Sequence, residues 1–377
     1  FFDKKYRKVS QKISYAPKKK IRIGYFSADF RKHAVMYLIK GLFEMHNKEQ
    51  FDVYVYSLNS VEDELTGELK RNVNVFRNIS DISDEKGAFI AREDSLDIAI
   101  DLMGYTKKRG LSIFSLRVAP IQISYLGYPG TSGSDGIDYL LADKVIIPEK
   151  FRKFYSEKVI YMPNCYQCND SKRKTSKKEF HKNELGLPEN AFVFACFNAN
   201  NKITPEEFDI WMSLLKKIKN SVLWLYKSND YSEINLKKES ENRGVESSRI
   251  VFADMLCNED HLSRIKCADL FLDTFNFNAH TTASDALWSG VPILTKQGKS
   301  FSARVCSSLL TSLGLEELIV QDNEEYEDKA FSIATNKLYL EDLKYRLNQS
   351  RTKSTLFDTK RFTRNLEEIF FKLVKNL

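Results

Sequence analysis

The sequence has no long run of apolar residues. No stretch approaches the roughly 20 consecutive apolar residues that span a bilayer. The basic segment 1–20 is not followed by an apolar run either, so we expect neither a membrane helix nor a signal peptide. The hydrophobic fraction of 42% suits a folded protein, and 377 residues are enough for two domains, each with its own core. Because the chain begins with Phe1 and not with Met, we expect it to be part of a longer protein.

Cysteine is scarce, with six residues, and only Cys165 and Cys168 form a C-x-x-C pair. A structural zinc site needs four ligands, usually from two such pairs, and the sequence has neither a second pair nor C-x-x-C-H. Scattered cysteines of this kind are typical of a reduced compartment. We therefore predict a cytoplasmic protein with no metal site at this pair.

The chain is basic, with a net charge of +7 and an isoelectric point near 8.8, but no nucleic-acid-binding motif accompanies this charge. Part of the excess lies in one stretch (171–190) that has the composition of a solvated linker. Its basic residues are Lys172, Arg173, Lys174, Lys177, Lys178 and Lys182. We expect a basic surface that attracts an anionic ligand only weakly, and no nucleic-acid partner.

Two nucleotide-binding signatures are missing. Neither G-x-G-x-x-G nor the P-loop pattern occurs, which counts against a dehydrogenase or a nucleoside-triphosphatase. Two other glycine-rich loops follow predicted strands, and their glycines would let the backbone closely approach a sugar or a domain interface, which would place them near the sugar and acceptor. These loops contain Gly104, Tyr105, Thr106, Gly130 and Thr131.

Predicted strands and helices alternate in two arrays separated by the basic stretch, which is typical of parallel βαβ units. The first array has strands at 21–25, 51–58, 96–102, 121–125 and 139–142 and a helix at 34–46. The second array has strands at 192–197, 222–226, 250–252, 270–273 and 292–295. We predict an α/β protein with two doubly wound, Rossmann-like domains (20–165 and 185–350) facing a cleft, and a helical C-terminal tail (351–377).

Two segments mark helix starts. Thr204 precedes Pro205 and lies three residues before Glu207, which is the pattern of a capping box with proline in the first turn. The second segment, NAHTTASDALWSG (278–290), lies between two predicted strands and predicts a helix from near Thr282 to Gly290.

The start of this second helix is the strongest candidate site. Its first-turn amides, the positive end of its dipole and the hydroxyls of Thr281 and Thr282 suit an anion, and His280 could add a donor to a diphosphate. Asp285 could close a capping box with Thr282, or it could accept hydrogen bonds from ribose hydroxyls. The pattern alone leaves both a nucleotide site and ordinary helix capping open.

Three further places follow predicted strands, at the edge where open α/β sheets bind ligands. His33 could act as a base or orient a hydroxyl, and Lys202 could meet phosphate charge. His261 and Arg264, three residues apart, would share one face of a helix. For each of them an ordinary surface position is the more common alternative.

Eight segments carry a family resemblance. They are GYFSADFRKH (24–33), DLMGYTKKRG (101–110), RVAPIQISYLGYPGTSG (117–133), DYLLAD (138–143), FNANNKITP (197–205), NSVLWL (220–225), LDTFNFNAHTTASDALWSGVP (272–292) and SARV (302–305). In this order they resemble the catalytic region of the O-linked N-acetylglucosamine transferase family, which includes the SPINDLY protein fucosyltransferases. The resemblance covers about residues 20 to 345, and the GYPGTSG and HTT segments make it specific.

The resemblance implies a GT-B fold whose C-terminal domain binds most of the donor, and it implies a role for each matching residue. His33 would position donor and acceptor or act as a base, and Lys202 would stabilise the leaving diphosphate. The phosphate-binding run would be His280, Thr281 and Thr282, and the ribose-binding acid would be Asp285. The segment holding uracil and ribose would contain Leu256, Cys257, Asn258, His261 and Arg264.

The sequence departs from the animal transferases at three positions of this pattern. Ala199 replaces a glutamine near the donor, Asn258 replaces a lysine at the ribose, and Asp97 replaces a histidine facing the sugar and acceptor. The segments LDTFNF (272–277) and MPNCYQC (162–168) are closer to SPINDLY-like and bacterial members, whereas His280 favours the N-acetylglucosamine type. The donor therefore stays open between UDP-GlcNAc, UDP-glucose and GDP-fucose.

The resemblance favours an inverting transfer of N-acetylglucosamine from UDP-GlcNAc to serine or threonine hydroxyls of a protein. Lys202, the helix start and His280 would stabilise the diphosphate charge in place of a metal ion, and no cofactor is expected. The proton acceptor could be His33, a donor phosphate oxygen or a water chain. Tetratricopeptide repeats, which hold the acceptor protein in the family, would lie upstream of this chain. A non-catalytic sugar-nucleotide-binding module and a nucleic-acid-binding protein remain alternatives.

Overall fold

The computed structural model describes residues 13, 16–106 and 110–377, so most of the basic segment 1–20 lies outside the described residues. The chain forms two compact units. Unit 1 contains the chain up to Lys172 together with Thr355–Leu377, and unit 2 is Arg173–Ser354. Among the described residues, no helix is long and apolar enough to cross a membrane.

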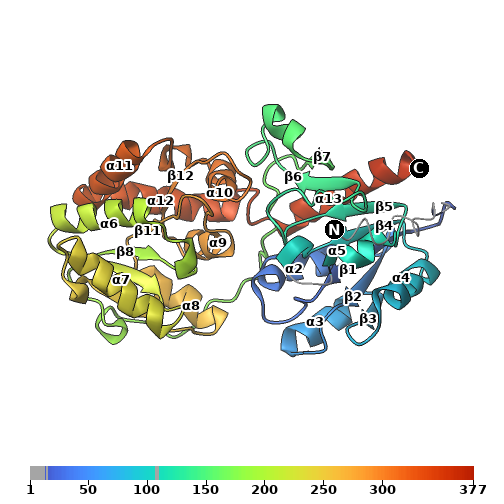
Figure 1. The fold of residues 1–377 in the computed structure, drawn as a ribbon, viewed down its shortest axis with the longest axis horizontal. Coiled ribbons are helices and arrows are strands. Elements are labelled where there is room, and N and C mark those ends of the chain that lie inside the picture. The colour runs from blue at the N-terminus through green and yellow to red at the C-terminus, as the bar shows by residue number, and fades with distance from the viewer. Residues whose placement is uncertain (1–12, 14–15, 107–109) are drawn as a thin grey trace. The chain divides into compact units, whose positions relative to one another are not determined.

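Unit 1 is built on a parallel sheet in the strand order β3-β2-β1-β4-β5-β6-β7 (Figure 1). Its strands are β1 (Ile21–Ser27), β2 (Phe51–Ser57), β3 (Val75–Asn78), β4 (Ile98–Asp101), β5 (Ile121–Ser124), β6 (Tyr139–Ala142) and β7 (Lys158–Tyr161). Its helices are α2 (Ala34–Met45), α3 (Glu64–Asn72), α4 (Asp84–Glu93), α5 (Gly110–Ser115) and α13 (Thr359–Lys375).

The core of unit 1 forms because the central strands are apolar on both faces and helices cover them. Strand β1 reads IRIGYFS, and nearly all of its side chains are buried. Phe26 stacks on Tyr56, with ring centroids 4.3 Å apart, and meets the edge of Phe114. Burying an aromatic side chain of this size contributes about 1.5–3 kcal/mol, so these rings fix the sheet against its helices.

The predicted helical C-terminal segment (351–377) is confirmed as helix α13, which belongs to unit 1 (Figure 1). Phe362, Leu366 and Phe370 form its buried face. Glu367 accepts hydrogen bonds from the imidazole of His46 (3.0 Å) and from the backbone of Asn47 (2.8 Å), at the end of α2. The chain therefore returns to its first unit before it ends.

Unit 2 repeats the architecture with the strand order β10-β9-β8-β11-β12-β13. Its strands are β8 (Phe192–Cys196), β9 (Ser221–Tyr226), β10 (Ile250–Ala253), β11 (Leu270–Leu272), β12 (Ile293–Lys296) and β13 (Ile319–Val320). Its α-helices are α6 (Pro205–Lys217), α7 (Asp230–Asn242), α8 (Asn258–Arg264), α9 (Thr281–Trp288), α10 (Val305–Leu313), α11 (Asn323–Thr335) and α12 (Lys337–Lys353).

Both sheets have the Rossmann order, in which the strand order reverses beside the first strand of each unit. All strand pairs are parallel, and the reversal lies between β1 and β4 in unit 1 and between β8 and β11 in unit 2. Ligands of such folds bind outside the carboxyl ends of the strands at this point. The prediction of two Rossmann-like domains is therefore confirmed, and each unit has its own reversal point at which ligand-binding residues are expected.

Candidate functional site

The carboxyl ends of β8 and β11 bring together several of the predicted residues in unit 2. Lys202 follows β8 in a short 3-10 turn, Asn200–Lys202, and His280 follows β11 directly before α9. Phe277 lies between them. The Lys202 ammonium is 4.0 Å from the centroid of the Phe277 ring, and the His280 ring stacks on the same ring with centroids 4.7 Å apart. A cation, an aromatic ring and an imidazole thus share one edge of the sheet.

Asp273, which the sequence analysis treated only as the end of a strand, organises this edge. Its buried Oδ1 accepts hydrogen bonds from the backbone N–H groups of Thr274 (2.9 Å) and Ala279 (2.6 Å), and Oδ2 accepts one from Thr295 (2.7 Å). These bonds close the loop that leads into α9. Burial raises the pKa of Asp273 to about 7, although hydrogen bonds and Lys202 act in the opposite direction.

Helix α9 starts at Thr281, one residue earlier than predicted, with His280 at the N-cap position. The His280 side chain makes no capping bond to the first-turn amides. The Thr282 hydroxyl donates to Asn198 Oδ1 (2.6 Å), and Asn198 in turn donates to Thr274 Oγ1 (2.7 Å). This start leaves first-turn N–H groups without a side-chain cap, which is the arrangement that favours an anion.

Neither capping box forms: the one that was an alternative role for Asp285 does not, and at α6 Thr204 is the N-cap residue, as predicted, but without the cap bond. Asp285 lies in the second turn of α9, where it cannot reach the first-turn amides that a cap satisfies. At α6 the Thr204 hydroxyl donates to the Glu207 carboxylate and makes no cap bond to the backbone. The predicted proline at the start of α6 is confirmed, since Pro205 is its first residue.

Lys202 is a partly buried cation. Burial lowers its pKa from the usual value for lysine, and the nearby Asp273 carboxylate opposes this shift. A desolvated ammonium gains more from an incoming anion than one in water, because the local dielectric is low. Lys202 therefore suits a phosphate group bound at the start of α9.

His280 stays a predicted hydrogen-bond donor to a diphosphate, and its buried ring favours the neutral form. Burial lowers its pKa to about 3, and the positive charge of Lys202 acts in the same direction. Its Nε2 lies 3.4 Å from the Ser302 carbonyl oxygen, which can only accept a hydrogen bond. A neutral imidazole that donates there contributes packing on Phe277 and no positive charge.

His261 and Arg264 share one face of α8, as predicted. Arg264 Nε donates to His261 Nδ1 (3.3 Å), and Arg264 Nη1 donates to the Asp254 carbonyl oxygen (2.6 Å). The His261 ring meets Phe197 edge-on at 4.9 Å. Burial lowers the pKa of His261 to about 4 and that of Arg264 to about 10. A neutral His261 that accepts at Nδ1 keeps its proton on Nε2, where it can donate to a ligand.

Asp285 forms a buried ion pair with Arg173. Arg173 Nη2 donates to Asp285 Oδ1, and both side chains are almost fully buried. Arg173 belongs to the stretch that we predicted to be a solvated linker, and at this position the prediction is wrong. Both residues belong to unit 2, which begins at Arg173, and both are buried.

The other predicted residues of unit 2 follow strands β8 and β10. Ala199 is exposed directly after β8, and Leu256 and Cys257 lie between β10 and α8. Asn258 is the first residue of α8, three residues before His261. Each of them stays a prediction as a donor contact.

In unit 1, His33 caps the start of α2 at the carboxyl end of β1. Its Nδ1 accepts a hydrogen bond from the Val35 N–H (3.3 Å) and lies 3.8 Å from Asp29 Oδ2. The side chain is 37% exposed, so solvent or a ligand can reach the ring. With Nδ1 accepting from the backbone, a neutral His33 carries its proton on Nε2.

The two glycine-rich loops of unit 1 pack against each other. Gly104 has φ +55°, and a Cβ there would lie 2.4 Å from Tyr128, so the turn after β4 requires glycine. The Tyr105 hydroxyl donates to the Ser132 carbonyl oxygen (2.6 Å), which joins this turn to the second loop. Thr106 donates to the Met103 carbonyl oxygen (2.8 Å).

In the second loop, the Thr131 hydroxyl donates to the Glu157 carboxylate (2.7 Å). Gly130 donates its backbone N–H to the Tyr128 carbonyl oxygen (3.1 Å). Both loops follow strands of the unit 1 sheet, β4 and β5, so they lie at the same edge as His33.

Asp97 does not lie at this edge. It precedes β4, so it is at the amino ends of the strands, and its carboxylate accepts hydrogen bonds from Lys18 (2.5 Å) and from the Arg22 backbone (2.7 Å). The expectation that Asp97 lies near the sugar and acceptor is therefore not supported. Asp97 instead holds β1 and β4 together.

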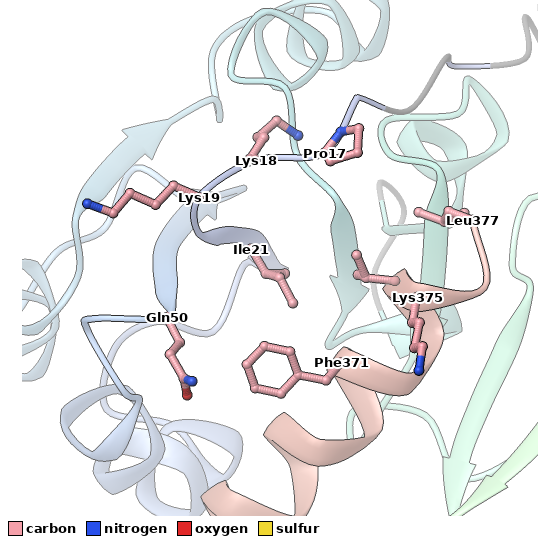
Figure 2. A pocket seen from close by; sticks show the side chains of 9 residues that line it. Pro17, Lys18, Lys19, Ile21, Gln50, Phe371, Lys375 and Leu377 are labelled. Atoms are coloured by element: carbon pink, nitrogen blue, oxygen red, sulfur yellow. The ribbon is translucent and has the colours of Figure 1, made fainter.

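A pocket of about 460 Å³ also opens at the amino ends of the unit 1 strands (Figure 2). Ile21, at the start of β1, and Phe371 of α13 form its apolar floor, and Lys18, Lys19 and Lys375 lie around it. This pocket is at the opposite end of β1 from His33, so it is separate from the candidate site.

Comparison with known proteins decides the family. The model of glycosyl transferase family 41 matches residues 2–179 and 173–366. The chain belongs to glycosyl transferase family 41. The prediction of an O-GlcNAc transferase and SPINDLY-like catalytic region is thereby confirmed.

Curated relatives of this family 41 chain come from plants and animals. It is 39% identical over 362 residues to an Arabidopsis thaliana protein named as a probable UDP-N-acetylglucosamine–peptide N-acetylglucosaminyltransferase, SEC, covering 94% of this chain and 37% of that protein. A Solanum lycopersicum SPINDLY protein is 30% identical, covering 95% of this chain and 39% of the relative. The chain thus spans about two fifths of the length of these relatives.

Solved structures agree with this assignment. A mutant of the Thermobaculum terrenum O-GlcNAc transferase superposes with a TM-score of 0.88 at 27% identity, covering 100% of this chain and 73% of that one. Anabaena HepE in complex with UDP and glucose has a TM-score of 0.62 at 13% identity, covering 93% of this chain and 100% of that one, which supports the fold alone. The family 41 chain therefore has the GT-B fold that the sequence predicted.

Proposed function

We propose that this family 41 chain is an inverting protein glycosyltransferase that moves N-acetylglucosamine from UDP-GlcNAc to serine or threonine hydroxyls. One observation carries the proposal. The Lys202 ammonium and the uncapped start of α9 lie together at the point of strand-order reversal in unit 2. The names of the SEC relative and of the Thermobaculum enzyme, both N-acetylglucosamine transferases, support the choice of sugar.

In this proposal the residues of unit 2 stabilise the leaving group. An acceptor oxygen attacks the anomeric carbon, the bond to the diphosphate oxygen breaks, and negative charge grows on UDP. Lys202 and the first amides of α9, at Thr281 and Thr282, would offset this charge. Because Asp273 and Asn198 already hold the loop and first turn of α9 in place, the amides there need little reorganisation when the charge develops. We propose that no metal ion or other cofactor is required.

The acceptor proton has to leave the attacking hydroxyl. The hydrogen bond from Val35 to His33 Nδ1 favours a neutral ring with its proton on Nε2, which can donate to a ligand but cannot take up a proton at that atom. This supports a role for His33 in positioning donor and acceptor. A donor phosphate oxygen or a water chain would then receive the proton.

The partners in this proposal are a UDP-sugar and a protein acceptor, with no nucleic acid. His261 and Arg264 would hold the uracil and ribose, together with Leu256, Cys257 and Asn258. Tetratricopeptide repeats upstream of this chain, as expected from the family, would hold the acceptor.

A transfer assay tests the proposal. The purified protein is incubated with UDP-GlcNAc and a library of serine- and threonine-containing peptides, and mass spectrometry locates any added N-acetylhexosamine. We expect modification of hydroxyl side chains, with an inverted anomeric centre by NMR. Tight UDP-GlcNAc binding without transfer to any peptide would favour a sugar-nucleotide-binding module instead. Transfer from GDP-fucose in preference to UDP-GlcNAc would identify a fucosyltransferase.

A further inference from the structure

The buried ion pair joins Asp285, which the family resemblance assigns to the ribose, to Arg173, which the resemblance does not assign. The Arg173 side chain is 2% exposed and the Asp285 side chain is 7% exposed. Four neighbouring basic residues of the same stretch are solvent-exposed instead: Lys172, Lys174, Lys177 and Lys178. Removing a guanidinium and a carboxylate from water is costly, so a buried pair of this kind requires compensation.

The hydrogen bonds of the pair do not provide that compensation within unit 2. Arg173 donates a hydrogen bond from Nη2 to Asp285 Oδ1. Its Nε and Nη1 are buried and have no hydrogen-bond partner among the described residues. Asp285 Oδ2 also accepts no hydrogen bond from the described part of the chain. An unsatisfied buried donor costs about 1–3 kcal/mol. Two buried donors and one carboxylate oxygen are therefore without a partner among the described residues.

The residues around the ion pair indicate which chemical groups a bound molecule would need. The end of α9 is joined to α8, because the Ser289 hydroxyl donates to the Leu262 carbonyl oxygen (2.9 Å). The charges of both Asp285 and Arg173 also act on His261 of α8. A ribose offers adjacent hydroxyls, each of which can donate one hydrogen bond and accept others. A carboxylate oxygen beside guanidinium N–H donors complements such a pair of hydroxyls. A phosphate would match the arginine but would repel the carboxylate.

We propose that Arg173 is a positioning residue of the nucleotide site: it fixes the Asp285 carboxylate for one ribose hydroxyl and donates from Nε or Nη1 to the neighbouring hydroxyl. This rests on the proposed use of a UDP-sugar and names a residue that the family pattern did not supply. Lysine cannot replace arginine in this role, because the planar guanidinium holds the carboxylate and donates sideways at the same time.

Deoxynucleotides separate this role from a purely structural one. Calorimetry would compare UDP, 2′-deoxy-UDP and 3′-deoxy-UDP on the wild-type protein, Arg173→Met and the control Lys174→Met, whose lysine is the exposed neighbour. We expect the wild type and the control to bind UDP on the order of tenfold more tightly than at least one deoxynucleotide. Arg173→Met should lose that preference while it keeps the weaker affinity for the deoxynucleotide. Equal losses for all three ligands would overturn the proposal.

Two further variants keep the test decisive. Arg173→Lys retains a positive charge beside Asp285, so it should fold if Arg173→Met does not, and it should still lose the preference for UDP. A wild-type preference in folded Arg173→Lys would contradict the proposal. In Asp285→Asn, adding Arg173→Met should change UDP affinity by less than threefold, because both residues act on the same ribose. If the wild-type protein binds no UDP at all, the proposed function fails, whichever residue was changed.

Discussion

Replacing Lys202 by methionine tests whether its ammonium stabilises the leaving diphosphate. Methionine keeps most of the apolar stem beside the Phe277 ring, where Nζ lies 4.0 Å from the centroid, and removes the charge. Burial lowers the pKa of Lys202, which means that the charged form is disfavoured in the protein without donor. The melting temperature of Lys202→Met should therefore equal or slightly exceed that of the wild type.

The expected kinetic effect is large. Two unit charges about 4 Å apart interact by roughly 4 kcal/mol at an effective dielectric constant of about 20. Since each 1.36 kcal/mol changes a rate about tenfold, kcat should fall by about 10²–10³, the range seen when one donor to a developing anion is removed. KM for UDP-GlcNAc should change less, because the charge on the diphosphate is greatest in the transition state.

Lys296→Met is a matched control for this variant. Its ammonium also lies over a phenylalanine ring, 3.9 Å from the centroid of Phe275, but it is paired with Glu206 (2.8 Å). Initial rates at saturating UDP-GlcNAc should be close to those of the wild type for Lys296→Met and about 10²–10³ lower for Lys202→Met. A Lys202→Met turnover within threefold of the wild type would refute the role of this charge.

Three other predictions follow from the site. Transfer should persist in EDTA, since Lys202 and backbone amides would offset the diphosphate charge; a loss reversed only by Mg²⁺ or Mn²⁺ would contradict this. His33→Ala should lower kcat while calorimetry gives an unchanged UDP affinity, and an equal loss of both would place His33 at the nucleotide. The pKa of His280 is about 3 in the folded protein and 6.5 in the unfolded chain, so the unfolded state binds more protons between these values. Lowering the pH from 6.5 towards 3 should therefore destabilise the wild type more than His280→Asn in urea titrations, and parallel losses would contradict the burial of His280.

The central strands could be predicted from the sequence because they are continuous apolar runs. Strands β1 and β8 read IRIGYFS and FVFAC, and both were predicted. Sequence reasoning missed three strands, β3, β7 and β13. Each lies at the edge of its sheet and is short and only partly buried. An edge strand needs few apolar residues, so its pattern is too weak to stand out.

In the candidate site, too, some residues could be predicted from the sequence and others could not. Lys202 and His280 could be placed together from sequence, because each follows a parallel strand and such strand ends share one edge. Asp273 carried a detectable signal, since it is a carboxylate at the end of the apolar run LFL. Arg173 carried none: it lies among lysines in a polar stretch, and only the folded structure shows that Asp285 is its partner.

Donor selectivity tests the central claim most directly. Calorimetric titrations of the purified protein with UDP, UDP-GlcNAc, UDP-glucose and GDP-fucose, in buffer containing EDTA, compare the nucleotides and sugars under one condition. The account predicts tight binding of UDP and UDP-GlcNAc and much weaker binding of GDP-fucose, with the affinity lost when Asp285 is changed to alanine. Tighter binding of GDP-fucose than of UDP-GlcNAc, or no binding of any UDP compound, would contradict the account.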